Sequence, residues 1–209
     1  AGGVTLSTGS IIIGALKTRQ EILIWTDSGI HSMRFIGSPF IFQFTVVNEG
    51  ISMISPKAAV SAGGAVFFMD SGGFYVYTGS VQPIDCSVLD YVFSNLNQGQ
   101  SYKVFATTNP DHNEVTWFYP IGSDNTDNTN YVTYNYVERL WAIGTMERGS
   151  WIQANSKNFP IASSVITSSN NNYLYIQERG HDADGSAMTA FIESGDVEMG
   201  DGERYMLLS

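Results

Sequence analysis

Two stretches of this chain, 43 residues apart, carry nearly the same pattern. The first runs from Ile22 to Gly37 around Asp27-Ser28-Gly29, and the second runs from Ala65 to Gly79 around Asp70-Ser71-Gly72. Each reads as an apolar strand, an Asp-Ser-Gly turn, a second strand and a closing glycine. Because propeller blades are small four-stranded sheets of roughly 40–50 residues, a hairpin repeated at this period predicts an all-β fold, a β-propeller-like array of four-stranded antiparallel blades.

The composition agrees with such a fold. The chain has 209 residues with 21 glycines, 12 phenylalanines and 11 tyrosines, which suits many turns between aromatic-rich strands. Charged residues make up only 14%, against about 25% in an average protein, so the surface is polar and uncharged as in packed assemblies. No run approaches the roughly 18 apolar residues of a membrane span. The single cysteine, Cys86, is interpreted as a small buried apolar side chain.

The net charge of −10 lies mostly near the C-terminus, where residues 178–204 hold eight acids against Arg179 and Arg204. A protein that grips nucleic acid carries a basic footprint, so we expect weak binding to duplex DNA. Residues 181–186 have the Asp-x-Asp-Gly pattern of a calcium loop, but no later glutamate falls at the required spacing. A solvated acidic turn is therefore favoured, and cation binding by residues 178–204 is left open.

One segment departs from the strand pattern. Apolar residues recur at helical spacing from Val88 to Leu96, and Asp85 to Ser87 offer N-cap side chains. We predict a short helix at about 86–97, inserted in the repeat, with Val92 and Leu96 buried. A second aromatic signal follows, since Asn135-Tyr136 and Leu140-Trp141 are typical of outer propeller hairpins in which an aromatic wedge fills the gap between blades.

Both ends of the sequence look like positions inside a longer chain. Ala1 is not a starting methionine, and Tyr205 to Ser209 read as the middle of a strand. We therefore interpret residues 1–209 as a single propeller domain, or a fragment of one, cut from a longer protein.

A polar stretch at 121–130 has almost no apolar side chains, so it reads as an exposed loop tip suited to contacts outside the domain. The predicted partner-contact residues are Gly122, Asp124, Asn125, Asp127, Asn128 and Asn130.

Catalytic chemistry is not readable in the sequence. His31, His112 and His181 are far apart and lie in no metal-binding or triad-like motif, so we predict no catalytic residues, no cofactor and no metal. Thr26-Asp27-Ser28-Gly29 lacks the tryptophan of the sialidase Asp box. The predicted structural turn residues, whose carboxylates would bond turn amides, are Asp27, Ser28, Gly29, Asp70, Ser71 and Gly72. The four tryptophans are interpreted as packing residues rather than sugar platforms.

Six runs of the chain carry a family resemblance: Ile24 to Met33, Val81 to Phe93, Asn113 to Pro120, Tyr134 to Tyr136, Phe191 to Asp196 and Gly200 to Gly202. They resemble the tail hub, or nozzle, proteins of short-tailed bacteriophages (podovirus tail structural proteins). The resemblance implies a virion protein located in the phage tail, a homo-oligomeric ring that contacts other tail proteins such as the adaptor and the tail fibre or needle. It also implies a conduit through which DNA passes without being tightly bound, and it brings no catalytic residues.

Two other functions stay open at this point. One is a carbohydrate-binding β-propeller, a lectin or adhesin. The other is a propeller glycoside hydrolase, which would need paired carboxylates at one central mouth.

Overall fold

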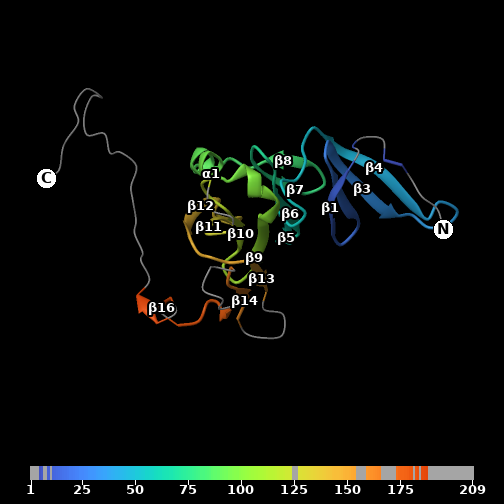
Figure 1. Ribbon diagram of the computed structural model, residues 1–209. Coiled ribbons are helices and arrows are strands. Elements are labelled where there is room, and N and C mark those ends of the chain that lie inside the picture. The colour runs from blue at the N-terminus through green and yellow to red at the C-terminus, as the bar shows by residue number, and fades with distance from the viewer. Residues whose placement is uncertain are drawn as a thin grey trace, which may run out of the picture. The chain divides into compact units, whose positions relative to one another are not determined.

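The computed structural model describes residues 5–6, 9, 11–123, 127–153, 159–165, 173–180, 182–183 and 185–187. The chain divides into two compact units, residues 1–177 and 178–209. Antiparallel sheets of three or four strands make up the first unit, which confirms the all-β prediction (Figure 1). The described part of the second unit holds a small two-stranded ladder of β16 (Asp182–Ala183) and β17 (Ser186–Ala187).

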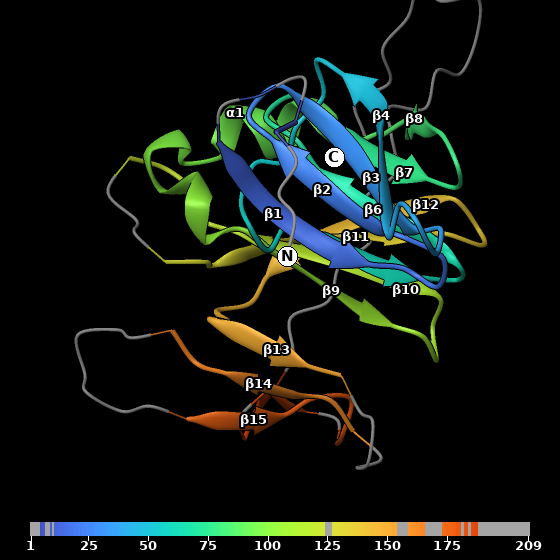
Figure 2. The same cartoon turned by 90° about the vertical axis from the view of Figure 1, so that its right-hand side faces the viewer.

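Four sheets follow one another along the first unit, and in each the strands pair in chain order. The first sheet contains β1 (Ile12–Lys17), β2 (Ile22–Thr26), β3 (Gly29–Phe35) and β4 (Phe42–Glu49). The second contains β5 (Ala59–Ala62), β6 (Ala65–Met69), β7 (Phe74–Tyr77) and β8 (Val81–Pro83). The third contains β9 (Phe105–Asn109), β10 (Glu114–Tyr119), β11 (Asn130–Asn135) and β12 (Leu140–Thr145). The fourth contains β13 (Ser150–Ile152), β14 (Ile161–Ser163) and β15 (Leu174–Ile176), which lie side by side in Figure 2.

The two copies of the sequence repeat form the same strand connection in two consecutive sheets. The turn with Asp27 joins β2 to β3, and the turn with Asp70 joins β6 to β7. Both turns therefore connect the second and third strands of consecutive four-stranded antiparallel sheets. No closed ring of sheets is found in the part of the chain that the structure describes.

Aromatic side chains hold consecutive sheets together. Successive side chains of a strand point to opposite faces, and the inward set of β2, Leu23 and Trp25, is fully buried. The Trp25 ring meets Phe68 of the second sheet edge-on at 5.4 Å between centroids. Further contacts join the second sheet to the third and the third to the fourth: Phe67 with Tyr134, Phe74 with Trp117 and Phe118 with Trp151.

The inserted helix lies between the second and third sheets along the chain. Helix α1 spans Leu89–Asn95, inside the predicted range of 86–97, and is followed by the 3-10 helix η1 (Gln98–Lys103). The N-cap is Val88, with no side-chain cap, rather than one of the polar residues from Asp85 to Ser87. Val92 and Leu96 are buried in the core, as the helical spacing predicts.

The connection between the first and second sheets is irregular over most of its length. Strand pairing in the second sheet begins only at Ala59. The amide of Ile54 instead donates to the carbonyl of Met69, so the preceding residues form an irregular connection that packs on the core. Neither helix of the described residues has the length and apolarity to cross a membrane.

Candidate functional site

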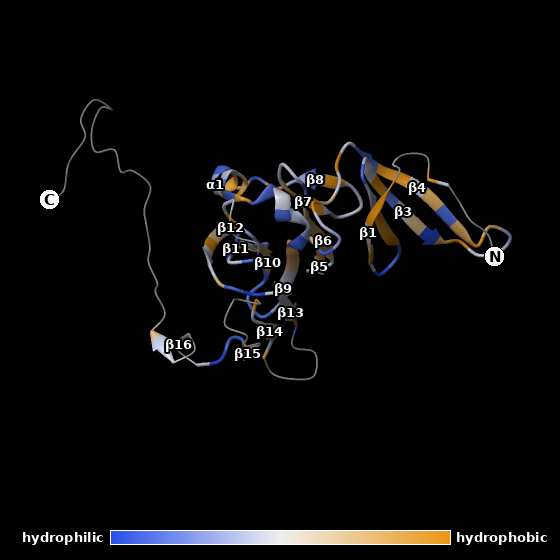
Figure 3. Cartoon of the chain, viewed as in Figure 1, coloured by the Kyte–Doolittle hydropathy of each residue, from blue (hydrophilic) through white to orange (hydrophobic). Residues whose placement is uncertain are grey.

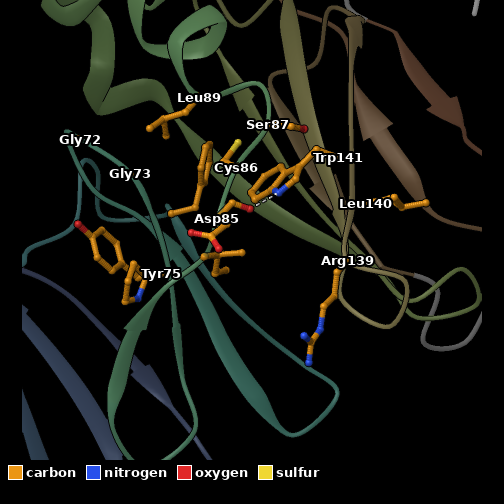
Figure 4. A pocket seen from close by; sticks show the side chains of 13 residues that line it. Gly72, Gly73, Tyr75, Asp85, Cys86, Ser87, Leu89, Arg139, Leu140 and Trp141 are labelled. Atoms are coloured by element: carbon orange, nitrogen blue, oxygen red, sulfur yellow. Dashed lines mark hydrogen bonds between the residues drawn. The ribbon is translucent and has the colours of Figure 1, made fainter. Parts of the chain in front are cut away.

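A groove of about 770 Å³ opens between the second and third sheets (Figure 4). Its walls come from the β6–β7 turn and β7, from the segment between β8 and α1, and from the β11–β12 turn with the start of β12. The residues that line it are Gly72, Gly73, Phe74, Tyr75, Pro83, Ile84, Asp85, Cys86, Ser87, Leu89, Arg139, Leu140 and Trp141.

Trp141 forms the aromatic wall of the groove. Its indole Nε1 donates a 2.8 Å hydrogen bond to the backbone carbonyl of Asp85, which ties β12 to the segment after β8. The indole ring lies 4.8 Å from Phe74 and 4.6 Å from Tyr134 between centroids. Trp141 is thus a wedge between neighbouring sheets, and the aromatic spacing of Asn135-Tyr136 and Leu140-Trp141 is the sequence signal for it.

The position of Arg139 is set by the turn before β12. The side-chain oxygen of Asn135 accepts hydrogen bonds from the amides of Val137 and Glu138, at 3.0 and 2.9 Å. The Arg139 amide then donates to the Asn135 carbonyl, and Arg139 adopts a left-handed φ of 61°. From this turn the guanidinium points away from the indole of Trp141 (Figure 4). Sequence reasoning did not identify Arg139 as a groove residue.

The titratable side chains of the lining are those of Tyr75, Asp85, Cys86 and Arg139. Burial raises the pKa of the Cys86 thiol, which disfavours the thiolate needed for nucleophilic attack. Asp85 and Arg139 supply one carboxylate and one guanidinium, without a lining histidine. Within the described ranges, histidine, cysteine and carboxylate side chains form no group that could hold a metal ion.

The loop predicted to contact partners is fixed at both described ends. At one end the Gly122 amide donates a 3.0 Å hydrogen bond to the carbonyl of Asn95, at the end of α1. At the other end Asp127 pairs with the Lys103 ammonium at 3.3 Å, and the Asn128 amide group donates to the Lys103 carbonyl at 2.9 Å.

This anchoring corrects the prediction of a fully exposed tip. Asn128 and Asn130 are each only 4% exposed. They are therefore not available to a partner in this conformation. Asn128 is held against Lys103 of η1, and Asn130 begins β11, where it pairs with Tyr119 and Thr145 inside the third sheet. Gly122 is exposed and Asp127 is half-buried, whereas Asp124 and Asn125 lie outside the described residues.

The two Asp-Ser-Gly turns are held by both side-chain and backbone hydrogen bonds. The carboxylate of Asp27 accepts from the amide of Ile11 at 3.3 Å, so it links the turn to the segment before β1. Within the turn, Thr26 Oγ1 donates to the carbonyl of Gly29 and accepts weakly from the amide of Ser28. In the second turn, which contains Ser71 and Gly72, the Asp70 amide donates to the Gly73 carbonyl at 2.9 Å.

The tryptophans divide into two groups. Trp25 and Trp117 are fully buried, so neither offers a sugar platform. Trp141 and Trp151 are half-buried, and Trp151 packs on Phe118. Only Trp141 lines the groove.

A buried ionic contact links the first two sheets. Glu21 is only 9% exposed and accepts hydrogen bonds from Ser32 and Arg34 of β3 and from the hydroxyl of Tyr77 at the end of β7. Burial alone would raise the pKa of Glu21, but these three hydrogen bonds outweigh it and lower that pKa below its ordinary value of 4.5. Burial and the Glu21 carboxylate together raise the pKa of Tyr77 to about 12. The contact therefore stabilises the packing of the first sheet on the second while Glu21 is ionised.

Replacing Glu21 by glutamine should remove part of the acid sensitivity of the fold. Because the pKa of Glu21 is lower in the folded chain than its ordinary value of 4.5, the carboxylate stabilises the fold above that pH. This contribution is lost as the pH falls through the lowered pKa. We expect Glu21→Gln to cost about 1–3 kcal/mol at pH 7 and to flatten the loss of stability below about pH 4.5, measured by urea unfolding. Glu49→Gln, an exposed acid of β4, is the matched control, and an equal effect there would contradict the prediction.

Comparisons with known proteins give little guidance. No family model matches the chain, and no curated protein matches it. A solved structure from Bacteroides fragilis, named "Putative exported protein", is similar at a TM-score of 0.34 and 10% identity. The similarity covers 78% of this chain and 69% of that one. At this TM-score it carries no argument about fold or function.

Proposed function

We propose that this chain is a non-enzymatic structural subunit, part of a β-propeller in the tail hub or nozzle of a short-tailed bacteriophage. In this proposal it assembles into a homo-oligomeric ring that contacts other tail proteins and through which DNA passes without being held. The sequence resemblance supports the phage assignment. The acidic net charge of −10 agrees with a conduit, because a negative wall repels phosphate.

The order of the sheets supports the propeller. Consecutive four-stranded sheets, each pairing its strands in chain order, pack face on face through aromatic contacts. That arrangement is the one expected of neighbouring propeller blades. The described residues make no catalytic constellation in the groove, which supports a structural role.

The observation that carries the assembly proposal is an uncovered apolar face on the first sheet. In β2 the side chains that point away from Leu23 and Trp25 are Ile22 and Ile24, and the register continues this face across β3 and β4. Apolar side chains occupy most of it, and several are strongly exposed. The members on β3 and β4 are His31, Met33, Phe35, Phe42, Phe44 and Val46; His31 is buried, whereas Phe35 is 71% and Phe42 50% exposed. Lys17 of β1, which pairs with Ile22, lies on the same face.

The fourth sheet, at the other end of the series, has a matching face. Trp151 and Ala162 point toward the third sheet, so Ile152, Ile161 and Ile176 share the opposite face, together with Leu174. Leu174 is 77% exposed and Ile152 69% exposed. Contiguous apolar surfaces of this kind mark interaction sites in soluble proteins.

A second copy of the chain is the occupant that both faces suit. Within the series, each sheet packs on the next one through apolar side chains. Among the described residues, only the outer face of the first sheet and the outer face of the fourth sheet have no such neighbouring sheet. Joining the first sheet of one copy to the fourth sheet of another repeats the same type of contact. Because the two faces differ, the interface is head-to-tail, and a head-to-tail interface generates a ring when its rotation closes.

Complementation between two variants tests this assembly. We expect Val46→Asp on the first sheet and Ile176→Asp on the fourth each to abolish higher oligomers of the chain in sedimentation velocity, because each places a charge in an apolar interface. An equimolar mixture should form heterodimers, since each variant keeps the face that the other has lost. Tyr102→Asp, at a 62% exposed aromatic of η1, is the control.

Two results would contradict the assembly. If the wild-type chain is monomeric in sedimentation velocity, the head-to-tail assembly is wrong. If Val46→Asp abolishes oligomers and Ile176→Asp does not, the chain forms a symmetric dimer through the first sheet instead. The phage assignment is tested separately, by antibodies against this chain that should label the tails of short-tailed virions in electron micrographs.

A further inference from the structure

We propose that the β3–β4 hairpin tip, residues 35–42, binds the surface of a membrane that contains anionic lipids. The tip has the sequence Phe-Ile-Gly-Ser-Pro-Phe-Ile-Phe, with no charged residue. This proposal goes beyond the structural role above. It rests on Ile36, Phe40 and Ile41, which lie beyond the strands of the assembly face, whereas Phe35 and Phe42 at the base of the tip belong to that face.

The apolar side chains of the tip are strongly exposed. Phe40 is 73% exposed, Ile41 58% and Ile36 50%. Phe35 and Phe42 flank them and contact each other edge-on at 5.9 Å between ring centroids. The hydropathy colouring in Figure 3 is orange over much of this hairpin. Such a cluster is costly to leave in water and therefore indicates a binding surface.

The tip is held as a hairpin. Phe35 pairs with Phe42 in the ladder, and the amide of Ile36 donates a 3.1 Å hydrogen bond to the carbonyl of Ile41. The apolar side chains of Ile36, Phe40 and Ile41 therefore project from one compact turn, and a turn of this kind can rest at the headgroup boundary, where water still reaches its backbone.

Charge is distributed unevenly along the first sheet. The register places the β1–β2 turn at the same end as the tip, because Lys17 pairs with Ile22, Ile22 with Met33 and Met33 with Phe44. This end therefore has three cations, Lys17, Arg19 and Arg34, against the one buried carboxylate of Glu21.

The opposite end of the sheet is acidic, since Asp27 and Glu49 lie there. The nearest turn of the second sheet, residues 78–80 beside Tyr77, is uncharged. A local excess of positive charge around an apolar tip is thus built into a chain of net charge −10.

These features favour a lipid surface over a protein partner. Interfacial membrane segments combine apolar side chains that enter the headgroup boundary with lysine and arginine that contact anionic lipids. The tip has exposed apolar side chains, with Lys17, Arg19 and Arg34 at the same end of the sheet, so it can insert into a flat lipid surface. A protein partner would need a pocket complementary to the tip.

Vesicle flotation of the full 209-residue chain tests the proposal. We expect binding to vesicles of 70% phosphatidylcholine and 30% phosphatidylserine, weakened about tenfold or more on pure phosphatidylcholine or in high salt. Phe40→Ser/Ile41→Ser should lower the affinity at least about tenfold. Lys17→Glu/Arg19→Glu should remove the preference for phosphatidylserine. The matched control is Tyr102→Ser/Val137→Ser, which removes similarly exposed side chains, 62% and 63%, from η1 and the β11–β12 turn, outside the assembly faces, and should leave binding unchanged.

A second readout reports the tip directly. In Phe40→Trp, brominated lipids should quench the new fluorescence when vesicles bind, whether or not the double serine variant folds. Absence of flotation, equal loss of binding in the control variant, or no quenching of the new tryptophan would overturn the proposal. Loss of self-association in Phe40→Ser/Ile41→Ser without any vesicle binding by the wild type would assign the tip to a protein partner instead.

Discussion

Trp117→Ala should lower the free energy of unfolding by about 3–5 kcal/mol, the cost typical of removing a large buried aromatic side chain. Trp117 is fully buried on β10, and its ring lies 4.9 Å from Phe74 of the second sheet. Its indole Nε1 donates a 3.0 Å hydrogen bond to the carbonyl of Ala58, just before β5. The substitution therefore opens a cavity between two sheets and leaves a buried carbonyl without this donor.

Urea unfolding followed by far-ultraviolet circular dichroism measures the effect without relying on tryptophan fluorescence. Trp117→Phe keeps most of the ring contact but removes the donor, so it should cost less, about 1–3 kcal/mol. Tyr102→Ala, at an exposed aromatic, should change stability by no more than about 0.5 kcal/mol. A Trp117→Ala variant within about 1 kcal/mol of the wild type would show that this indole does not hold the second and third sheets together.

Val92→Asp should cost about 3–5 kcal/mol, because it places an unpaired carboxylate in the core or expels the helix from it. Val92 has no exposed surface, and its carbonyl accepts from the amide of Leu96 at 3.0 Å at the end of α1. For a chain of this length the change corresponds to a fall of roughly 6–20 °C in melting temperature.

The helix itself supplies the control for this substitution. Tyr91, one residue earlier, is 47% exposed, so Tyr91→Asp adds the same charge on the solvent side of α1. It should change the melting temperature by a few degrees at most. An unchanged melting temperature in Val92→Asp would mean that α1 is not anchored in the core.

The spacing of the strand repeat and the residues of its turns were enough to predict the fold class from the sequence alone. The repeat of an apolar strand, an Asp-Ser-Gly turn and a second strand predicted consecutive four-stranded sheets, and its two copies fall at the same step of two such sheets. Helical spacing likewise predicted the inserted helix with Val92 and Leu96 inward, since these signals depend on residues a few positions apart. The start of the helix was misplaced because polar residues at 85–87 resemble caps, while the backbone turns in only after Val88.

Tertiary packing decided which of the predicted residues can act. Residues 121–130 look solvent-exposed in the sequence, yet Asn128 and Asn130 are buried. Asn128 donates to the carbonyl of Lys103, 25 positions earlier, and Asn130 pairs with Tyr119 and Thr145 in the third sheet. The pairing of Glu21 with Tyr77 and the groove beside Trp141 also join segments 56 positions apart. Side-chain pattern fixes which face of a strand is apolar, but only the stacking of the sheets decides which apolar faces are covered. The uncovered ones, on the first and fourth sheets and at the tip of residues 35–42, are the surfaces on which the proposed functions rest.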